Sequence, residues 1–174
     1  MVDVFDAAKR SWLMSRIRGT NTKPERIVRS LVHRLGFRFT LHGPSNRSLP
    51  GRPEIVLPRH RTVIFVHGCF WHGHPGCKTF RLPKSRRGWW RAKIARNRER
   101  DAAHEAALQA MGWRVVVVWE CTLRRRASIE ELAGMLERTL RGTARITRIR
   151  YDEGSDPAAN VPLLVAEEED PMGS

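Results

Sequence analysis

Every cysteine of this 174-residue chain belongs to one set of four residues that can bind a single metal ion. The set consists of Cys69, His74, Cys77 and Cys121. Thiolates and imidazoles are the ligands that zinc prefers, and a closed structural site uses four of them. Such a site constrains the fold strongly, because residue 121 must return to a loop that lies 44 residues earlier. We therefore predict a structural Zn²⁺ site with these four ligands.

Other interpretations of the cysteines stay open at this point. Free cysteine is a common core residue, so ordinary buried thiols are one alternative. A disulfide framework does not suit an odd count of three cysteines in a chain of this length. His67 and His72 flank the same Gly-Cys-Phe-Trp turn, and either of them can replace His74 as the zinc ligand.

Positive charge dominates the body of the chain. Lys and Arg together number 32 against 18 Asp and Glu, and every base lies within residues 1–150. A body this basic, with far more Arg than Lys, favours a polyanion, because guanidinium groups bind phosphate bidentately. An arginine-rich proteome encoded by a high-GC genome is the alternative, but composition bias alone does not produce this imbalance of charge. We predict nucleic-acid binding, with phosphate contacts from Arg10, Arg16, Arg18, Arg81, Lys84, Arg86 and Arg87.

The chain is predicted to form one domain over residues 1–151, followed by an acidic tail. Its length suits a single domain with a real core. Residues 1–20 form a basic DNA-binding arm, and residues 152–174 carry no base and are predicted to be disordered. The apolar runs are too short for a membrane span, and the N-terminus lacks the layout of a signal peptide. We expect a cytoplasmic monomer.

Hydrophobic patterning predicts a mixed α/β sheet with helices on its faces. Thr22 is the expected N-cap of one helix, with Glu25 at the capping-box position and Gly36 at the end. Ser128 is the expected cap of the last helix. Four consecutive valines at 115–118 indicate a buried strand. In full, we predict helices over 8–20, 23–35, 89–111 and 128–140, and strands over 37–41, 54–57, 62–66, 113–119 and, as an edge strand, 144–151.

Several blocks of sequence occur in order between about Ser11 and Leu123. They are Leu49-Pro50-Gly51-Arg52-Pro53-Glu54, Val66-His67-Gly68-Cys69-Phe70-Trp71-His72, Trp90…Lys93-Ile94…Asn97…Arg100-Asp101, Gly112-Trp113-Arg114-Val115 and Trp119-Glu120-Cys121. Together they resemble the very-short-patch-repair (Vsr) mismatch endonucleases, and blocks in order are more specific than any single motif. The resemblance implies a restriction-endonuclease-like fold with a structural zinc. It also implies nicking of DNA on the 5′ side of the thymine in a T:G mismatch that arises from deamination of 5-methylcytosine.

The resemblance assigns a catalytic Mg²⁺ to Glu54 and to the backbone carbonyl of Val66. Glu54 follows a Gly-Arg-Pro turn, where an exposed strand-start residue is the plain alternative. The family normally has Asp at this position. The additional methylene of Glu moves the carboxylate, and a misplacement of about 1 Å can cost on the order of 100-fold in rate. A non-enzymatic DNA-binding module that has lost turnover through this change is therefore an alternative function.

Five further residues receive catalytic roles from the resemblance. His72 would be the general base, oriented by Asp101, and His67 a second catalytic imidazole. Asn97 lies four residues before Asp101, so the two share a helix face, for which a solvated surface is the alternative. Glu25 would be an accessory carboxylate, with the capping box as its alternative role.

Aromatic residues are the predicted means of mismatch recognition. Rings wedged between base steps test how easily a step unstacks, which groove contacts alone test poorly. The resemblance places the intercalating residues at Met14, Phe70, Trp71 and Trp90. Core packing is the alternative, and we prefer it for Trp113 and Trp119.

The predicted partner is double-stranded DNA containing a mismatch, with other mismatch-repair proteins as further partners. A related endonuclease with another mismatch or sequence target is a second alternative to the T:G nickase. A zinc hydrolase is disfavoured, because His67 and His72 have no obvious third ligand once the cysteines are committed elsewhere.

Overall fold

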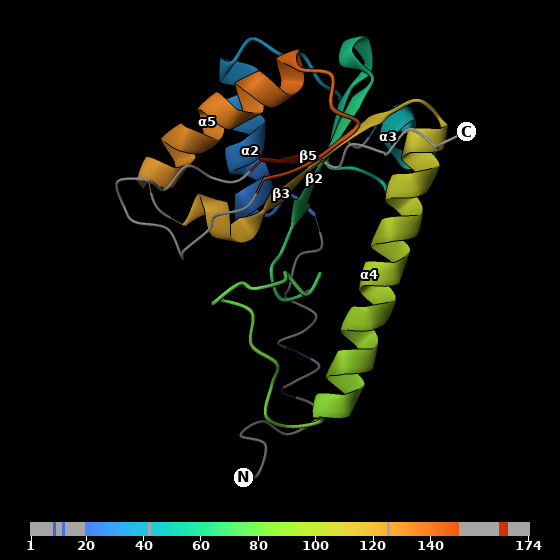
Figure 1. Cartoon of the computed structure of the whole chain (residues 1–174), viewed down its shortest axis with the longest axis vertical. Helices are drawn as coiled ribbons and strands as arrows, with labels where there is room; N and C mark the ends of the chain where they lie inside the picture. The colour runs from blue at the N-terminus through green and yellow to red at the C-terminus, as the bar shows by residue number, and fades with distance from the viewer. Residues whose placement is uncertain are drawn as a thin grey trace, which may run out of the picture.

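A computed structural model describes residues 9, 12, 20–41, 43–124, 126–149 and 164–166 of the chain. Most of the predicted helix at 8–20 and most of the acidic tail lie outside this part. Figure 1 shows a mixed sheet with α2 (Lys23–Arg34) and α5 (Arg126–Arg141) on one side and α4 (Arg87–Ala110) on the other. The predicted mixed α/β architecture is therefore confirmed. None of the described helices is long and apolar enough to cross a membrane.

Within the described residues one sheet contains five strands, in the order β1-β2-β3-β4-β5. The strands are β1 (Ile55–Leu57), β2 (Thr62–His67), β3 (Arg114–Trp119), β4 (Ile146–Ile149) and β5 (Leu164–Ala166). The two outer pairs are antiparallel, whereas β2 and β4 both run parallel to β3. The prediction of β4 as an edge strand is wrong, because β5 pairs with its outer side. Strand β5 itself falls within the segment predicted to be disordered.

The core lies on both faces of the sheet. Val115, Val116, Val117 and Val118 are each no more than 1% exposed, as expected for a strand covered on both sides. Because successive side chains of a strand point to opposite faces, Val116 and Val118 pack with α2 and α5, while Val115 and Val117 pack in a second cluster with Leu108 of α4.

Helix α2 begins as its sequence predicts. The Thr22 hydroxyl oxygen accepts from the Glu25 N–H at 3.4 Å and donates to the Glu25 carboxylate at 2.8 Å. The Asn21 N–H also donates to that carboxylate, at 2.8 Å. These bonds satisfy donors that a helix start leaves without partners. Gly36 follows the helix with φ +85°, a conformation that glycine adopts without strain.

Three further predictions differ from the structure. Residues 37–41 form no strand; Thr40 alone makes a bridge, to Val56, and the chain then turns into the short helix α3 (Pro44–Ser48), where a loop was predicted. The predicted cap at Ser128 is wrong, because α5 already begins at Arg126. Arginine and alanine favour helix interiors, so the two residues before Ser128 extend the helix.

Candidate metal centre and active site

The parallel pair β2 and β3 brings the functional residues to one end of the sheet. In their register His67 lies opposite Trp119, the last residue of β3. The loop 68–77 follows β2, and a 3₁₀ turn, η2 (Glu120–Leu123), follows β3. Because parallel strands end at the same edge, Cys121 on η2 meets the loop despite its distance along the chain.

The four predicted zinc ligands come together in this loop. Their donor atoms all lie within 4.8 Å of one another. The sulfurs of Cys69 and Cys121 lie 3.6 and 3.5 Å from Nδ1 of His74. Zinc bonds of about 2.3 Å to sulfur and 2.0–2.1 Å to nitrogen at a tetrahedral angle place these atoms about 3.6 Å apart. The cluster Cys69, His74, Cys77 and Cys121, named the Cys3His cluster below, therefore fits a tetrahedral metal ion.

The surroundings of the Cys3His cluster suit thiolate ligands. Cys69 and His74 are buried, and the His74 ring stacks on Trp119 with centroids 4.0 Å apart. A hydrogen bond from Cys121 lowers the pKa of the Cys69 thiol well below its ordinary value; burial opposes this, and a hydrogen bond from His74 reinforces it. The thiolate is the form that binds metal. Cys77 is half-buried, with its sulfur 2.9 Å from the Thr79 hydroxyl.

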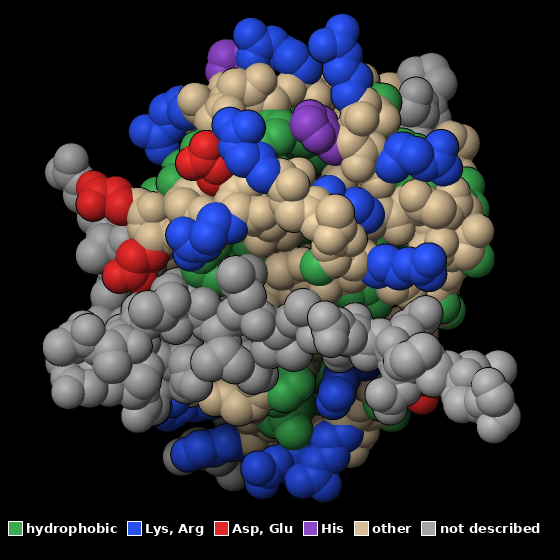
Figure 2. Space-filling view, turned by 45° about the horizontal axis from the view of Figure 1, so that its top comes forward, with side chains coloured by type: hydrophobic (Ala, Val, Ile, Leu, Met, Phe, Trp, Pro, Cys, Tyr) green, Lys and Arg blue, Asp and Glu red, His purple; other side chains and the backbone are tan. Residues whose placement is uncertain are grey.

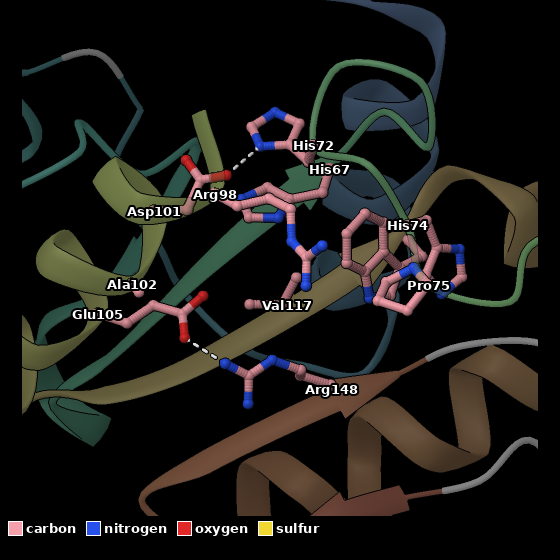
Figure 3. Close-up of a pocket in the computed structure, with 11 residues that line it drawn as sticks. His67, His72, His74, Pro75, Arg98, Asp101, Ala102, Glu105, Val117 and Arg148 are labelled. Atoms are coloured by element: carbon pink, nitrogen blue, oxygen red, sulfur yellow. Dashed lines mark hydrogen bonds and ion pairs between the residues drawn. The ribbon is translucent and has the colours of Figure 1, made fainter. Parts of the chain in front are cut away.

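A second cluster forms on the other side of the same loop (Figure 3). Nδ1 of His72 lies 2.6 Å from a carboxylate oxygen of Asp101, which α4 supplies. The His67 and His72 rings stack with centroids 3.8 Å apart and planes within 6°. A cavity of about 70 Å³ connects this cluster to Glu54. Its lining is Gly51, Glu54, Phe65, His67, His72, Asp101, His104 and Glu105. The name catalytic cluster is used below for Glu54, His67, His72 and Asp101, four of the six predicted catalytic residues.

Burial tunes the titration of the catalytic cluster. It raises the pKa of Glu54 to about 7, although the Val66 N–H, which donates to Glu54 Oε2 at 3.1 Å, opposes the shift. Burial and the nearby charge of His72 lower the pKa of His67 to about 3, so its imidazole is neutral. Burial raises the pKa of Asp101, but the hydrogen bond and charge of His72 outweigh it, and the net direction is down.

The ionised Asp101 fixes the His72 ring. A carboxylate facing Nδ1 favours the tautomer with the proton on that nitrogen, which leaves Nε2 as an acceptor. The structure also supplies the third potential metal ligand that the sequence did not offer, since donor atoms of His67, His72 and Asp101 lie within 4.8 Å of one another. An imidazole binds a metal in its own ring plane, however. Two rings stacked face to face cannot both point at one ion, so this arrangement suits proton transfer better than metal binding.

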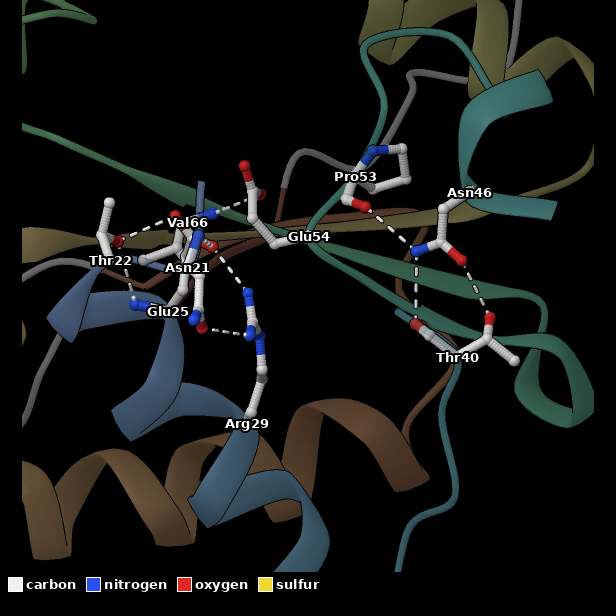
Figure 4. A network of polar contacts seen from close by, with 9 residues as sticks. All are labelled: Asn21, Thr22, Glu25, Arg29, Thr40, Asn46, Pro53, Glu54 and Val66. Carbon is white, nitrogen blue, oxygen red and sulfur yellow. Dashed lines mark hydrogen bonds and ion pairs between the residues drawn. The ribbon is translucent and has the colours of Figure 1, made fainter. Parts of the chain in front are cut away.

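Glu25 does not line the cavity of the catalytic cluster. It is 4% exposed, and its carboxylate is occupied by the helix-start bonds and by an ion pair with Arg29 at 2.6 Å (Figure 4). Its charge does reach Glu54, whose pKa it raises. These contacts match the capping-box alternative, with an electrostatic influence on Glu54 in addition.

Asn97 contacts the loop and does not line the cavity. Its side-chain amide donates to the backbone carbonyl of Trp71 at 2.8 Å and accepts from Arg100 at 3.0 Å. Asn97 and Asp101 therefore hold the same loop from one face of α4, one through the main chain and the other through His72. The loop passes close to this helix at Gly73, where a Cβ atom would lie 2.5 Å from Ile94.

Three predicted wedge residues form one aromatic cluster: Phe70, Trp71 and Trp90. The Phe70 ring centroid lies 5.1 Å from the centroids of both tryptophans, and the two tryptophans are 6.1 Å apart. All three rings are half-buried, whereas Trp89 is 47% exposed. Trp119 is buried and Trp113 packs against the core, as predicted. Met14 lies outside the described residues.

Basic side chains are numerous on the surface of the molecule. Figure 2 shows Lys and Arg spread over one face of the molecule, with few acids between them. Lys84, Arg81, Arg86 and Arg87 are exposed, while Arg10, Arg16 and Arg18 lie outside the described residues.

Sequence reasoning missed a second cavity, of about 550 Å³, on the other side of Glu54. Arg29, Arg47 and Arg52 line it together with Glu54. Arg52 belongs to the sequence block that ends at Glu54, and this position beside a predicted metal ligand could have indicated that it lines the cavity. A groove of about 290 Å³ beside His67 was also missed; Arg98 and the ion pair of Glu105 with Arg148 line it. No local pattern links Glu105 to Arg148.

The relatives of this chain are DNA endonucleases. A family model described as DNA mismatch endonuclease Vsr matches residues 2–78. The type II nicking enzyme V.XorIIP of Xanthomonas oryzae pv. oryzae is 52% identical over 130 residues, which cover 75% of this chain and 93% of the relative. The DNA mismatch endonuclease Vsr of Escherichia coli is 44% identical over 133 residues, 76% of this chain and 83% of the relative. The type II nicking enzyme V.NmeAIP of Neisseria meningitidis is 40% identical over 141 residues, which cover 81% of this chain and 98% of the relative.

This chain therefore belongs to the Vsr family of DNA mismatch endonucleases, and the resemblance seen in its sequence is confirmed. Its function is that of a DNA endonuclease.

Proposed function

We propose that this protein hydrolyses one phosphodiester bond of duplex DNA, on the 5′ side of the thymine in a T:G mismatch. The observation that carries the proposal is the convergence of Glu54, His67, His72 and Asp101 on one cavity. The aromatic cluster adjoins this cavity through the loop, and the arginine-lined cavity opens on the far side of Glu54. One relative is named a mismatch endonuclease, and others are named nicking enzymes.

His72 is the proposed general base. With Nδ1 directed at Asp101, its Nε2 takes the proton of the attacking water. Asp101 stabilises the imidazolium that forms, since its own low pKa keeps it ionised. His67 stays neutral because of its burial, so it serves as an uncharged ring that stacks on His72 and not as an acid.

Glu54 and the carbonyl of Val66 are the proposed ligands of Mg²⁺. The residues fit such an ion: Glu54 is a half-buried carboxylate whose pKa is raised, and its side-chain hydrogen bonds come from the main-chain N–H groups of Val66 and of Glu54 itself, with no cationic side chain among them. Magnesium sites of nucleases use one or two carboxylates and leave the remaining positions to water and substrate phosphate. When bound, the ion supplies positive charge to the developing phosphorane. Arg47 and Arg52, which line the adjoining cavity, are proposed to hold the neighbouring phosphates.

The Cys3His cluster is the proposed structural Zn²⁺ site. Four protein donors leave no open position for substrate, as in other closed zinc sites. The ion would join the loop after β2 to the turn after β3 and so fix His72 on that loop and His67 at the end of β2.

Phe70, Trp71 and Trp90 are proposed to enter the duplex beside the mismatch. Half-buried rings in mutual contact form a rigid wedge, and the bond from Asn97 to the Trp71 carbonyl holds its base. Because the relatives come from bacteria and are named as enzymes that act on DNA, we propose that the protein acts in the cytoplasm, as a monomer and alongside other mismatch-repair proteins.

A nicking assay tests the proposed function. A labelled duplex with one T:G pair, a matched T:A duplex and the Glu54→Asp variant are compared with and without Mg²⁺. The proposal expects a single nick 5′ of the mismatched thymine. The absence of a nick from either protein, with DNA binding intact, would contradict it and favour a binding module.

A second candidate is an endonuclease of the same chemistry with another target. The observation that favours it is the name shared by several relatives, type II nicking enzyme, which mentions no mismatch. Cleavage of matched and mismatched duplexes side by side separates the two candidates, because a matched target would be cut equally well without the T:G pair.

A further inference from the structure

The main chain at Glu54 is not held by the sheet. Glu54 lies one residue before β1, and the preceding segment is irregular. Gly51 and Arg52 both have positive φ, at 73° and 52°, and Pro53 has no N–H to donate. The loop has one internal backbone bond, from the Arg52 N–H to the Leu49 carbonyl at 3.1 Å. A contact from outside the loop must therefore hold the peptide that precedes Glu54.

Asn46 on α3 makes that contact (Figure 4). Its side-chain amide donates to the Pro53 carbonyl at 3.2 Å, which belongs to the peptide that joins Pro53 to Glu54. The same amide donates to the Thr40 carbonyl at 3.2 Å, and its oxygen accepts from the Thr40 hydroxyl at 3.0 Å. Both N–H groups are thus used, and Asn46 is only 2% exposed.

Thr40 extends the contact to the other side of Glu54. Its N–H donates to the Val56 carbonyl at 2.8 Å, and the Val56 N–H donates back at 3.2 Å. Asn46 and Thr40 therefore hold the chain at residue 53 and at residue 56. Glu54 lies between these two points, with its carboxylate on the Val66 N–H.

We propose that Asn46 is a positioning residue for the carboxylate of Glu54. This inference rests on the proposed role of Glu54 as a ligand of a divalent cation. A long side chain reaches a fixed point only when the peptide before it is fixed, and Asn46 fixes that peptide. Residues that orient metal ligands typically change metal affinity or activity about 10- to 100-fold when replaced.

Divalent-cation binding tests the proposal without relying on catalysis. Mn²⁺, which also prefers oxygen ligands, is titrated into zinc-loaded protein by calorimetry, with Glu54→Gln to identify the site. Asn46→Ala is expected to weaken Mn²⁺ binding about 10-fold and to raise the Mg²⁺ concentration for half-maximal nicking, while affinity for the duplex without metal stays within about twofold.

Thr62→Val is the matched control. It also removes a buried hydrogen bond, that of the Thr62 hydroxyl to the His60 carbonyl, but at the far end of β2. This variant should keep the wild-type Mn²⁺ affinity. Equal affinities in Asn46→Ala and Thr62→Val would overturn the proposal.

Thr40→Val is a milder variant for the case that Asn46→Ala does not fold. It removes only the hydroxyl that orients the Asn46 amide. A reduced Mn²⁺ affinity is expected, and wild-type affinity would overturn the proposal. Wild-type protein that binds no Mn²⁺ at Glu54 would refute both the metal role and this inference. Loss of Mn²⁺ binding in Asn46→Ala, combined with no cleavage at T:G, would leave the inference standing and refute only the proposed target.

Discussion

The loop 68–77 contributes residues to two clusters of opposite character. The Cys3His cluster turns four donors inward, and its sulfur–nitrogen distances of 3.5 and 3.6 Å already suit one ion. The catalytic cluster leaves a cavity of about 70 Å³ between its groups, and its two histidines stack instead of converging. A closed donor set holds structure, whereas an open one with shifted pKa values leaves room for water and substrate.

Trp119 lies between the two clusters. The ring of His74 stacks on it at 4.0 Å, and the ring of His67 meets its edge at 5.4 Å. The rings of His72, His67, Trp119 and His74 thus form a continuous series of contacts from one cluster to the other. The comparison teaches that one short stretch of sequence can contribute to two different sites, because Cys69, His74 and Cys77 face one cluster while His67 and His72 face the other.

The largest expected effect comes from removing zinc. A strong chelator, or Cys121→Ser, should destabilise the protein by on the order of 10 kcal/mol and unfold the loop, because structural zinc contributes folding free energy directly. Thermal unfolding followed by circular dichroism measures this. An unchanged melting temperature after chelation would contradict a structural role for the Cys3His cluster.

Replacing His72 should affect rate and not stability. We expect His72→Ala to lower the nicking rate about 1,000-fold, within the range for loss of a general base, with duplex affinity unchanged. Asp101→Asn should cost less, about 10- to 100-fold, because it only orients the ring. His33→Ala, at an exposed position on α2, is the control. Equal rates for His72→Ala and the control would assign the proton transfer to another group.

The raised pKa of Glu54 predicts a pH-dependent stability without divalent cation. The folded protein retains the Glu54 proton up to about pH 7, whereas the unfolded chain releases it near 4.5. Stability from this group is therefore present below pH 4.5 and is lost as pH rises through 7. Glu54→Gln should stabilise the protein by up to ~3 kcal/mol at pH 8 and little at pH 4.5. Denaturant unfolding at both pH values measures the free energy of unfolding of the variant and of the wild type. An equal stabilisation at both pH values would contradict the raised pKa of Glu54.

The smallest expected effect concerns recognition. Trp71→Ala should reduce the preference for T:G over T:A duplexes about 10-fold, since stacking on one base is worth roughly 1–3 kcal/mol. Overall affinity should fall less, because phosphate contacts dominate it. Competition binding with both duplexes measures the preference. Equal losses on the two duplexes would argue against the wedge.

The predictable parts of the fold depended on local patterns. The capping residues Thr22 and Glu25 and the valines at 115–118 indicated their elements correctly, because a cap and a doubly covered strand are local in sequence. Residues 37–41 misled, since their apolar pattern suits a strand, yet Asn46 ties Thr40 to Pro53 and leaves only one bridge. That tie is a tertiary contact that no periodicity signals.

The candidate site also has parts that local sequence predicts and parts that depend on tertiary packing. The spacing of Cys69, His74 and Cys77 predicted the cluster that the structure assembles, and the family blocks pointed to Glu54, His72 and Asp101. The arginine-lined cavity and the role of Asn46 depend on the packing of α3, a helix too short and polar to be predicted. Residue roles within the catalytic cluster remain proposals that the variants above test.

The most direct test of the division between the two clusters is a Mg²⁺ titration of the zinc-loaded protein on the T:G duplex. Melting temperature and zinc content are followed in the same samples. We predict that a single nick appears only with Mg²⁺, while the melting temperature changes little and each chain keeps one zinc ion. Nicking that is independent of Mg²⁺ and follows zinc content instead would contradict the account.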